Sequence, residues 1–172
     1  MVECRRVKTM KPRLYLETTI PSYLTAWPSR DLVRAAHQQI TREWWEHRRA
    51  EFDLFVSQVV VRECEGGDST AAEKRLEVIR DLPLLEETAE AVSLAKSLLR
   101  EVPLPEQAAV DALHIGIAAV QGINYLLSWN CRHIANASLR LRIESICRER
   151  GYEPPIICTP DELLQNEDRE DG

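Results

Sequence analysis

The chain has 172 residues, of which 44% are hydrophobic and 29% are charged. This length and polarity are typical of one globular domain, since domains average roughly 100–150 residues. No apolar run approaches the ~20 residues that a helix needs to cross a bilayer, so we expect no association with a membrane. The five cysteines are odd in number and none has CxxC spacing, which favours reduced thiols in a cytoplasmic protein over a disulfide framework or a zinc site.

The formal net charge of −6 is unevenly distributed along the chain. Residues 161–172 contain six acidic residues and one arginine, whereas residues 130–150 contain five arginines and two glutamates. The negative total therefore does not exclude a polyanionic partner such as nucleic acid. The same arginines are equally typical of a solvated helix face, and the sequence leaves both interpretations open.

Strand and helix patterns alternate in the first half of the chain. A strand is expected at 13–17, and the hydroxyl residues and Pro21 that follow it can start a helix. Residues 29–49 repeat apolar side chains every four positions, which predicts an amphipathic helix. The further elements expected up to residue 101 are a strand at 53–57, a helical turn at 58–65, a helix at 70–81 opened by a capping box of Thr70 and Glu73, a strand at 82–85, and a helix capped by Thr88.

The alternation continues in the second half. Pro105 is placed to start a helix that extends to about residue 121 and is apolar on nearly every side, so it is expected inside the molecule. A strand at 125–129, a helix at 138–150 and a strand at 155–158 follow. This order predicts an α/β fold of three layers, with a central parallel sheet of about five strands between helices. We expect the domain at 11–164, between an N-terminal extension at 1–10 and an acidic tail at 165–172, both disordered.

Three acidic residues stand next to apolar segments that are expected to be buried. Glu17 ends the first strand, Glu63 follows a run of valines, and Asp111 interrupts the apolar helix. Removing a carboxylate from water costs several kcal/mol, more than the roughly 2–7 kcal/mol of a neutral polar group, unless a partner compensates it. Ligands of open parallel sheets bind outside the carboxyl ends of the strands, where Glu17 and the corner at 128–130 should lie. We therefore predict that the three acids converge on a cation.

Carboxylate and amide oxygens suit Mg²⁺ or Mn²⁺ rather than zinc. Without metal, three like charges held together would raise the pKa of at least one of them. With metal, a bound water becomes a better nucleophile and charge on a phosphodiester is stabilised. Metal-dependent phosphodiester cleavage is therefore a chemistry that these residues permit.

Each acidic residue also has a simpler interpretation. Glu17 can be exposed at a strand end, Glu63 can lie on a helix face, and Asp111 can cap a helix or pair with an arginine. His114, one turn after Asp111, is more often a hydrogen-bonded core histidine than a metal ligand on such a helix. The sequence does not support other α/β functions, because it lacks GxGxxG, GxxxxGK[ST] and GxSxG segments and the residues of a phosphoacceptor receiver domain.

Four segments in order carry a resemblance to a known family: LYLETT at 14–19, VVRE at 60–63, DALH at 111–114 and LSWN at 127–130. They resemble the PIN-domain family and, within it, the VapC-type toxins of bacterial type II toxin–antitoxin systems, over roughly residues 11–164. The resemblance implies a flanked parallel sheet, Mg²⁺ or Mn²⁺ in an acidic pocket, and endonucleolytic cleavage of RNA. It assigns the acidic positions to Glu17, Glu63 and Asp111, a fourth position to Asn130, and supporting roles to Thr18 and Ser128.

Two residues depart from the family pattern. The first acidic position is usually aspartate, and Glu17 is one methylene longer. Asn130 occupies a position that is usually aspartate, so it can bind a metal-held water through its amide oxygen but adds no charge and cannot act as a base. We expect weaker binding of a second ion as a result.

The leading hypothesis from the sequence is a ribonuclease that hydrolyses RNA with a metal-activated water, with Arg132 and His133 as candidates for phosphate contact. The alternative is a catalytically impaired PIN-like module that binds RNA or a protein without cleaving it. The resemblance also implies a small antitoxin that blocks the pocket and a homodimer. The exposed side of the helix at 29–49 is a candidate for such an interface.

Overall fold

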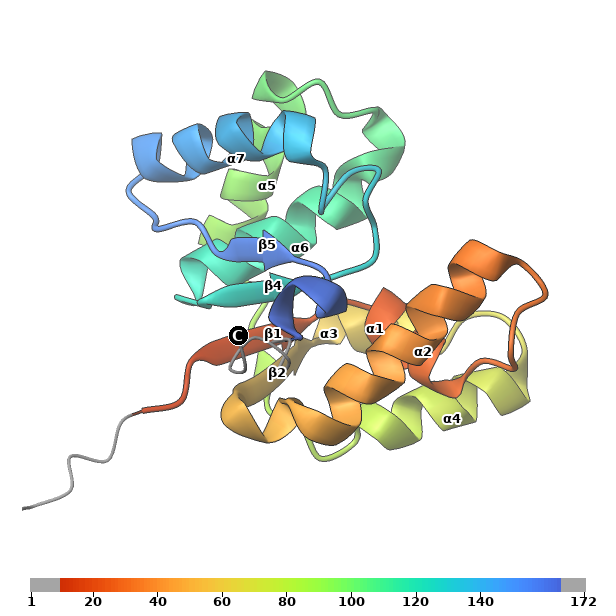
Figure 1. The fold of residues 1–172 in the computed structure, drawn as a ribbon. Coiled ribbons are helices and arrows are strands. Elements are labelled where there is room, and N and C mark those ends of the chain that lie inside the picture. The colour runs from red at the N-terminus through yellow and green to blue at the C-terminus, as the bar shows by residue number, and fades with distance from the viewer. Residues whose placement is uncertain (1–9, 165–172) are drawn as a thin grey trace, which may run out of the picture.

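The computed structural model describes residues 10–164, which form a five-stranded parallel sheet with helices around it (Figure 1). The strand order is β3-β2-β1-β4-β5, which places β1 in the middle of the sheet. Parallel pairing joins Leu14 to both Leu54 and Tyr125. The strands are β1 (Arg13–Leu16), β2 (Asp53–Ser57), β3 (Leu84–Leu85), β4 (Tyr125–Leu127) and β5 (Ile156–Cys158).

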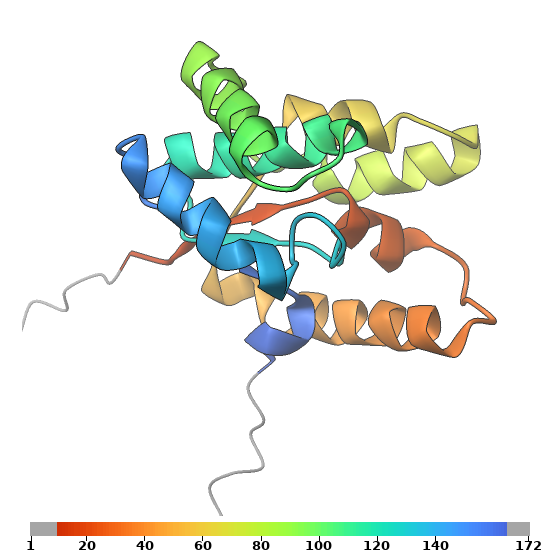
Figure 2. The same ribbon diagram turned by 90° about the horizontal axis from the view of Figure 1, so that it is seen from above.

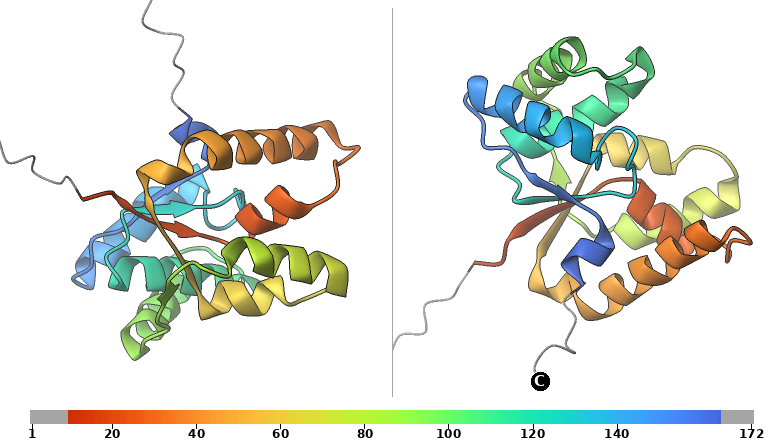
Figure 3. Two further views of the ribbon diagram at one scale, coloured as in Figure 1. Left: turned by 90° about the horizontal axis from the view of Figure 1, so that it is seen from below. Right: turned by 45° about the horizontal axis from the view of Figure 1, so that its top comes forward.

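Helices lie on both faces of the sheet. Figures 2 and 3 show α2 on one face and α3, α4, α5 and α6 on the other, so the predicted three-layer arrangement is confirmed. Helix α5 packs against both α6 and α7. The helices are α1 (Thr19–Thr25), α2 (Leu32–His47), α3 (Gln58–Cys64), α4 (Ser69–Ile79), α5 (Ala89–Glu101), α6 (Ala109–Val120) and α7 (Ala137–Glu149), with short 3-10 helices η1 (Arg49–Glu51), η2 (Glu106–Ala108) and η3 (Pro160–Leu163).

The central strand and α6 form the most buried part of the core. Leu14, Tyr15 and Leu16 of β1 are completely buried, because the strand has neighbours on both edges and helices on both faces. In α6, seven of the twelve residues are buried, as the apolar sequence predicted. Because all five strands are parallel, the residues that follow β1, β2 and β4 lie along the same edge of the sheet.

Several element boundaries differ from those predicted. The capping box of Thr70 and Glu73 is wrong: α4 begins at Ser69, because the Asp68 side chain accepts a hydrogen bond from the Ala71 N–H. Helix α2 begins three residues later than predicted, since Asp31 caps it. The predicted helix from Pro105 is divided into η2 and α6.

Strand β4 also ends earlier than expected, at Leu127, where the chain turns into the corner that carries Ser128 and Asn130. Strand β3 is limited to two residues. The cap by Thr88 is confirmed, because its hydroxyl accepts from the Ala91 N–H at 3.2 Å.

The predicted disorder at the two ends of the chain falls on residues 1–9 and 165–172, which lie outside the described residues. Met10, the remaining residue of the expected extension, is 90% exposed. Among residues 10–164, no helix combines the length and the apolar character that a membrane span requires.

We predict that Gly116→Ala destabilises the protein, because α5 and α6 approach each other closely at this position. A methyl group on Gly116 would lie 2.5 Å from the Ala91 carbonyl oxygen, so the helices would have to separate. Overpacking of this kind costs about 1–3 kcal/mol, which denaturant unfolding can measure. The control is Gly66→Ala, whose new methyl group would lie 3.3 Å from the Glu63 carbonyl oxygen and should cost much less.

Candidate metal centre

Glu17 lies immediately after the central strand and is only 4% exposed. One carboxylate oxygen, Oε2, accepts every hydrogen bond recorded for the side chain. The donors are the Thr19 N–H at 3.1 Å, the Thr19 hydroxyl at 2.6 Å and the Ser128 hydroxyl at 2.8 Å. Glu17 is therefore not an exposed residue at a strand end, and its position is fixed by residues from α1 and from the corner after β4.

Burial raises the pKa of the Glu17 carboxyl. The charge of His114 and the hydrogen bonds from Thr19 and Ser128 act in the opposite direction but do not outweigh burial. Burial therefore favours the protonated carboxyl, unless a nearby cation stabilises the ionised form.

Glu63, on α3, faces solvent and interacts with the buried part of the site through its Oε2 atom. His114 Nε2 lies 2.8 Å from Glu63 Oε2, and the Thr18 hydroxyl donates to the same oxygen. Burial by itself would raise the pKa of Glu63, but the hydrogen bond and charge of His114, followed by the Thr18 bond, hold it below the usual range. Glu63 therefore stays ionised at neutral pH.

His114, on α6, is completely buried, and both of its ring nitrogens are hydrogen-bonded. Its Nδ1 lies 2.8 Å from the Tyr15 hydroxyl, which in turn lies 2.6 Å from the Ser57 hydroxyl. Ser57 also accepts from the Val60 N–H at 3.4 Å. With a neutral ring, every partner is satisfied when Ser57 donates to Tyr15, Tyr15 to Nδ1, and Nε2–H to ionised Glu63; with a protonated ring, both nitrogens donate and Tyr15 donates to Ser57 instead. This chain of bonds fixes the orientation of Glu63.

Burial also raises the pKa of the Tyr15 hydroxyl, so it remains protonated and able to donate. The sequence analysis did not identify Tyr15, Ser57 or Thr19 as part of the site. Tyr15 is a polar group between two leucines in a strand that is buried on both sides, which is the only sequence signal for the relay. Thr19 lies in the LYLETT segment at 14–19, but a threonine at this place is equally typical of the start of a helix.

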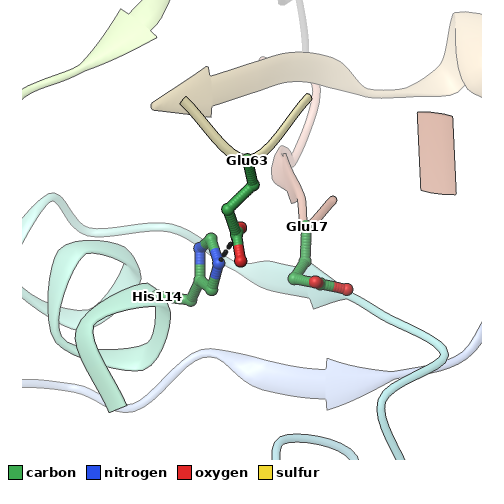
Figure 4. A group of neighbouring side chains, drawn as sticks. All are labelled: Glu17, Glu63 and His114. Carbon is green, nitrogen blue, oxygen red and sulfur yellow. Dashed lines mark hydrogen bonds and ion pairs between the residues drawn. The ribbon is translucent and has the colours of Figure 1, made fainter. Parts of the chain in front are cut away.

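Glu17, Glu63 and His114 form a group whose potential ligand atoms all lie within 4.8 Å of one another. Figure 4 shows Glu63 and His114 pointing toward each other, with Glu17 beside them. All hydrogen bonds recorded for the two glutamates use Oε2, so each Oε1 is without a donor from the described part of the chain. Two carboxylate oxygens without donors, one of them on a buried acid, fit a hard divalent ion.

Asp111 lies in a neighbouring group rather than in this one. Its Oδ1 accepts from Asn130 Nδ2 at 2.9 Å, and its Oδ2 lies 2.7 Å from His133 Nδ1. The predicted convergence of three acids thus divides into Glu17 with Glu63 and a separate Asp111 group. Ser128 joins the two, because it donates to Glu17 and accepts from the Asn130 N–H at 2.9 Å.

The Asn130 amide oxygen accepts a hydrogen bond from the His133 N–H at 3.1 Å. The amide orientation follows from its partners, because the carboxylate of Asp111 needs a donor and the His133 N–H needs an acceptor. The role of this oxygen toward a metal-held water stays a prediction.

The arginine-rich segment is less positive in effect than its composition indicates. Arg142 and Arg150 pair with Glu101, and Arg148 pairs with Glu144 and Glu153. Arg132 is exposed, whereas His133 is partly buried against Asp111. Their contact with phosphate stays a prediction, and three of the other four arginines form ion pairs with glutamates.

An aromatic pair stabilises the corner after β4. The His37 ring stacks on Trp129 with centroids 3.9 Å apart and planes 13° apart. The Trp129 indole donates to the Thr41 hydroxyl at 2.7 Å, and its backbone N–H donates to the Thr19 hydroxyl at 2.8 Å. These contacts hold Ser128 and Asn130 in place beside Glu17.

We predict that Tyr15→Phe destabilises the fold by about 1–3 kcal/mol, because it removes the hydroxyl that bonds both to the Ser57 hydroxyl and to His114 Nδ1 in the buried core. Urea unfolding measures the change. The matched control is Tyr125→Phe, since the Tyr125 hydroxyl makes no hydrogen bond to another described residue, and it should change stability by less than about 0.5 kcal/mol. Equal effects of the two substitutions would contradict the relay.

We predict that Glu17→Gln raises the thermal stability of the metal-free protein at pH 7.5. The raised pKa means that the folded protein retains a proton on Glu17 which the unfolded chain has already released. Wild-type stability therefore falls as the pH rises from the unfolded to the folded pKa of Glu17. Above this window the glutamine avoids the cost of burying a charge. Each gain of about 1 kcal/mol in the free energy of unfolding raises the melting temperature of a chain of this size by roughly 2–4 °C.

The measurement is a melting curve in a chelator at several pH values. The advantage of Glu17→Gln should shrink as the pH falls below the folded pKa of Glu17, because the wild-type side chain is then also neutral. The control Glu73→Gln removes an exposed charge from α4 and should show neither effect. A variant less stable than wild type at every pH would show that burial does not dominate the energetics of Glu17.

No protein-family model matches the chain, and no curated protein sequence matches it. The solved structures that it resembles include VapC20 of Mycobacterium tuberculosis, described as a toxin that cleaves the sarcin–ricin loop. Its sequence identity is 16% and its TM-score 0.56, and the match covers 72% of this chain and 95% of that one. VapBC2 from Rickettsia felis, solved with a DNA fragment from its promoter, has 14% identity and a TM-score of 0.55, over 85% of this chain and 97% of that one. The chain therefore has the PIN-like α/β fold of VapC proteins.

Proposed function

We propose that this protein is a metal-dependent endoribonuclease of the PIN/VapC type. The observation that carries the proposal is the pair of carboxylates, Glu17 and Glu63, at the carboxyl edge of a VapC-like sheet. Each has an oxygen that accepts no hydrogen bond from residues 10–164, and the exposed side chain of Glu63 opens the group to solvent. The edge of the sheet is where ligands of such folds bind.

Glu17 and Glu63 would hold Mg²⁺ or Mn²⁺, because their oxygens are the hard ligands that these ions prefer. When bound, the ion lowers the pKa of a bound water and stabilises negative charge on a phosphodiester. His114 keeps Glu63 oriented, and Thr18, Thr19 and Ser128 hold the other carboxylate oxygens in place. Arg132 and His133, in the loop beside Asp111, would contact the phosphate of an RNA substrate.

RNA is the proposed substrate because the VapC20 toxin, which shares the fold, is described as cleaving the sarcin–ricin loop. The likeness supports the fold, and the acidic group supplies the chemistry. We also propose a cognate antitoxin as partner, since VapBC2 shares the fold.

The start of α2 is the proposed interface for that antitoxin or for a homodimer. Leu32 and Val33, which are adjacent in the first turn of α2, are 86% and 65% exposed. Exposed apolar residues that lie close together in this way are typical of protein interaction sites.

We predict that the purified chain cleaves a panel of structured and single-stranded RNAs in the presence of Mn²⁺ and that a chelator abolishes cleavage. Glu63→Gln should lower the rate at least about 100-fold, which corresponds to roughly 2.7 kcal/mol of activation free energy. Glu73→Gln, which changes an exposed glutamate of α4 in the same way, should leave the rate unchanged. Equal cleavage by wild type and Glu63→Gln, or cleavage in chelator, would disprove the proposed mechanism.

The alternative function is an RNA- or protein-binding module that does not cleave. It is favoured by one observation, the neutral Asn130 hydrogen-bonded to Asp111. Retention of RNA without cleavage at any metal concentration, together with restoration of cleavage by Asn130→Asp, would establish this alternative.

A further inference from the structure

The acidic residues of the site differ in whether they have a carboxylate oxygen that accepts no hydrogen bond from the described residues. Glu17 and Glu63 each have one oxygen that accepts no hydrogen bond from the residues that the structure describes. Asp111 has none, because Oδ1 accepts from Asn130 Nδ2 and Oδ2 is paired with His133 Nδ1. Its side chain is only 19% exposed, so solvent offers little in addition.

Asn130 cannot easily release Asp111, because four of its polar groups have partners. Besides the bond to Asp111, its amide oxygen accepts from the His133 N–H, and its backbone N–H donates to Ser128. Its carbonyl oxygen accepts from the Ile134 and Ala135 N–H groups at 3.1 and 2.8 Å. Turning the amide over would place its oxygen against a carboxylate and its NH₂ group against the His133 N–H, so the loop fixes its orientation.

His133 is held on two sides by the same group. Its ring nitrogen Nδ1 is paired with Asp111 at 2.7 Å, and its backbone N–H donates to Asn130 at 3.1 Å. Asp111, Asn130 and His133 therefore form a closed set of mutual hydrogen bonds. A cation at Asp111 would have to break at least one of them and would meet the NH₂ face of a neutral amide.

We propose that the chain binds a single divalent ion, at Glu17 and Glu63, and that Asp111 is a positioning residue which holds Asn130 and His133 instead of an ion. The proposal rests on the metal-dependent function proposed above and specifies which of its acidic residues ligate. In this arrangement both carboxylate oxygens of Asp111 are engaged by Asn130 and His133 instead of by a second ion.

The test is calorimetric titration of the chelator-treated full chain with Mn²⁺. Wild type should bind one ion, and Asp111→Asn should still bind one with a dissociation constant within about threefold of wild type. Glu17→Gln should weaken binding at least about tenfold. Loss of a residue that only supports a ligand typically lowers metal affinity about 10–100-fold, and loss of the ligand itself costs more. Two ions per wild-type chain, or a tenfold loss in Asp111→Asn, would overturn the proposal.

The role of Asn130 is tested with Asn130→Asp, which places two carboxylates side by side and should add a second, weaker ion. An unchanged stoichiometry in this variant would overturn the part assigned to Asn130. Circular dichroism and melting curves establish that each variant is folded.

A spectroscopic measurement separates positioning from a merely structural role. The imidazole ¹⁵N signals of His133, assigned with His133→Gln, should move in Asp111→Asn. On saturation of wild type with diamagnetic Mg²⁺, the His133 Nδ1 signal should stay in place while those of His114, which contacts Glu63, move. Movement of the His133 signal with Mg²⁺ would mean that Asp111 exchanges its hydrogen bond with His133 for a contact with the ion, and it would overturn the proposal.

The outcomes distinguish this inference from the function on which it rests. Absence of any ion from wild type would overturn both. Two ions with intact RNA cleavage would overturn the inference alone.

Discussion

The buried carboxylate of Glu17 at the end of the central strand is the constraint on which the rest of the site depends. Strand β1 has neighbours on both edges and helices on both faces, so a charge at its end is removed from most of the solvent. Three hydrogen bonds to one oxygen reduce the cost of this burial but do not remove it, and the pKa of the carboxyl remains raised. The residues that donate these bonds also connect α1, β4 and the corner after β4, so the same charge organises the whole edge of the sheet.

Glu63 complements Glu17 because its pKa is shifted in the opposite direction. It faces solvent, and His114 together with Thr18 favours its ionised form. The relay from Ser57 through Tyr15 to His114 links this surface carboxylate to the centre of the sheet. The site thus combines one acid whose charge is disfavoured by burial with one acid whose charge is favoured by its hydrogen-bond partners.

The corner after β4 makes the surroundings of Glu17 and Asp111 different. Ser128 bonds to Glu17, whereas Asn130, two residues later, bonds to Asp111. A neutral amide at this position converts Asp111 from a free carboxylate into the acceptor of a closed hydrogen-bonded group with His133. The fold is that of VapC proteins, and the hydrogen bonding in this half of the edge is set by the neutral side chain of Asn130.

The sequence by itself determined the alternation of strands and helices, the burial of α6, the helix cap at Thr88 and the position of Glu17 and Glu63 next to buried elements, because these follow from local periodicity and from charges placed beside apolar runs. Boundaries such as the start of α4 were missed where a neighbouring aspartate offered a better cap. Only the tertiary structure decided which acids share a group and which side chains support them. Several of the bonds that do so join residues far apart in the chain, 42 positions for Tyr15 with Ser57 and 111 positions for Glu17 with Ser128, and no local pattern records such a pairing.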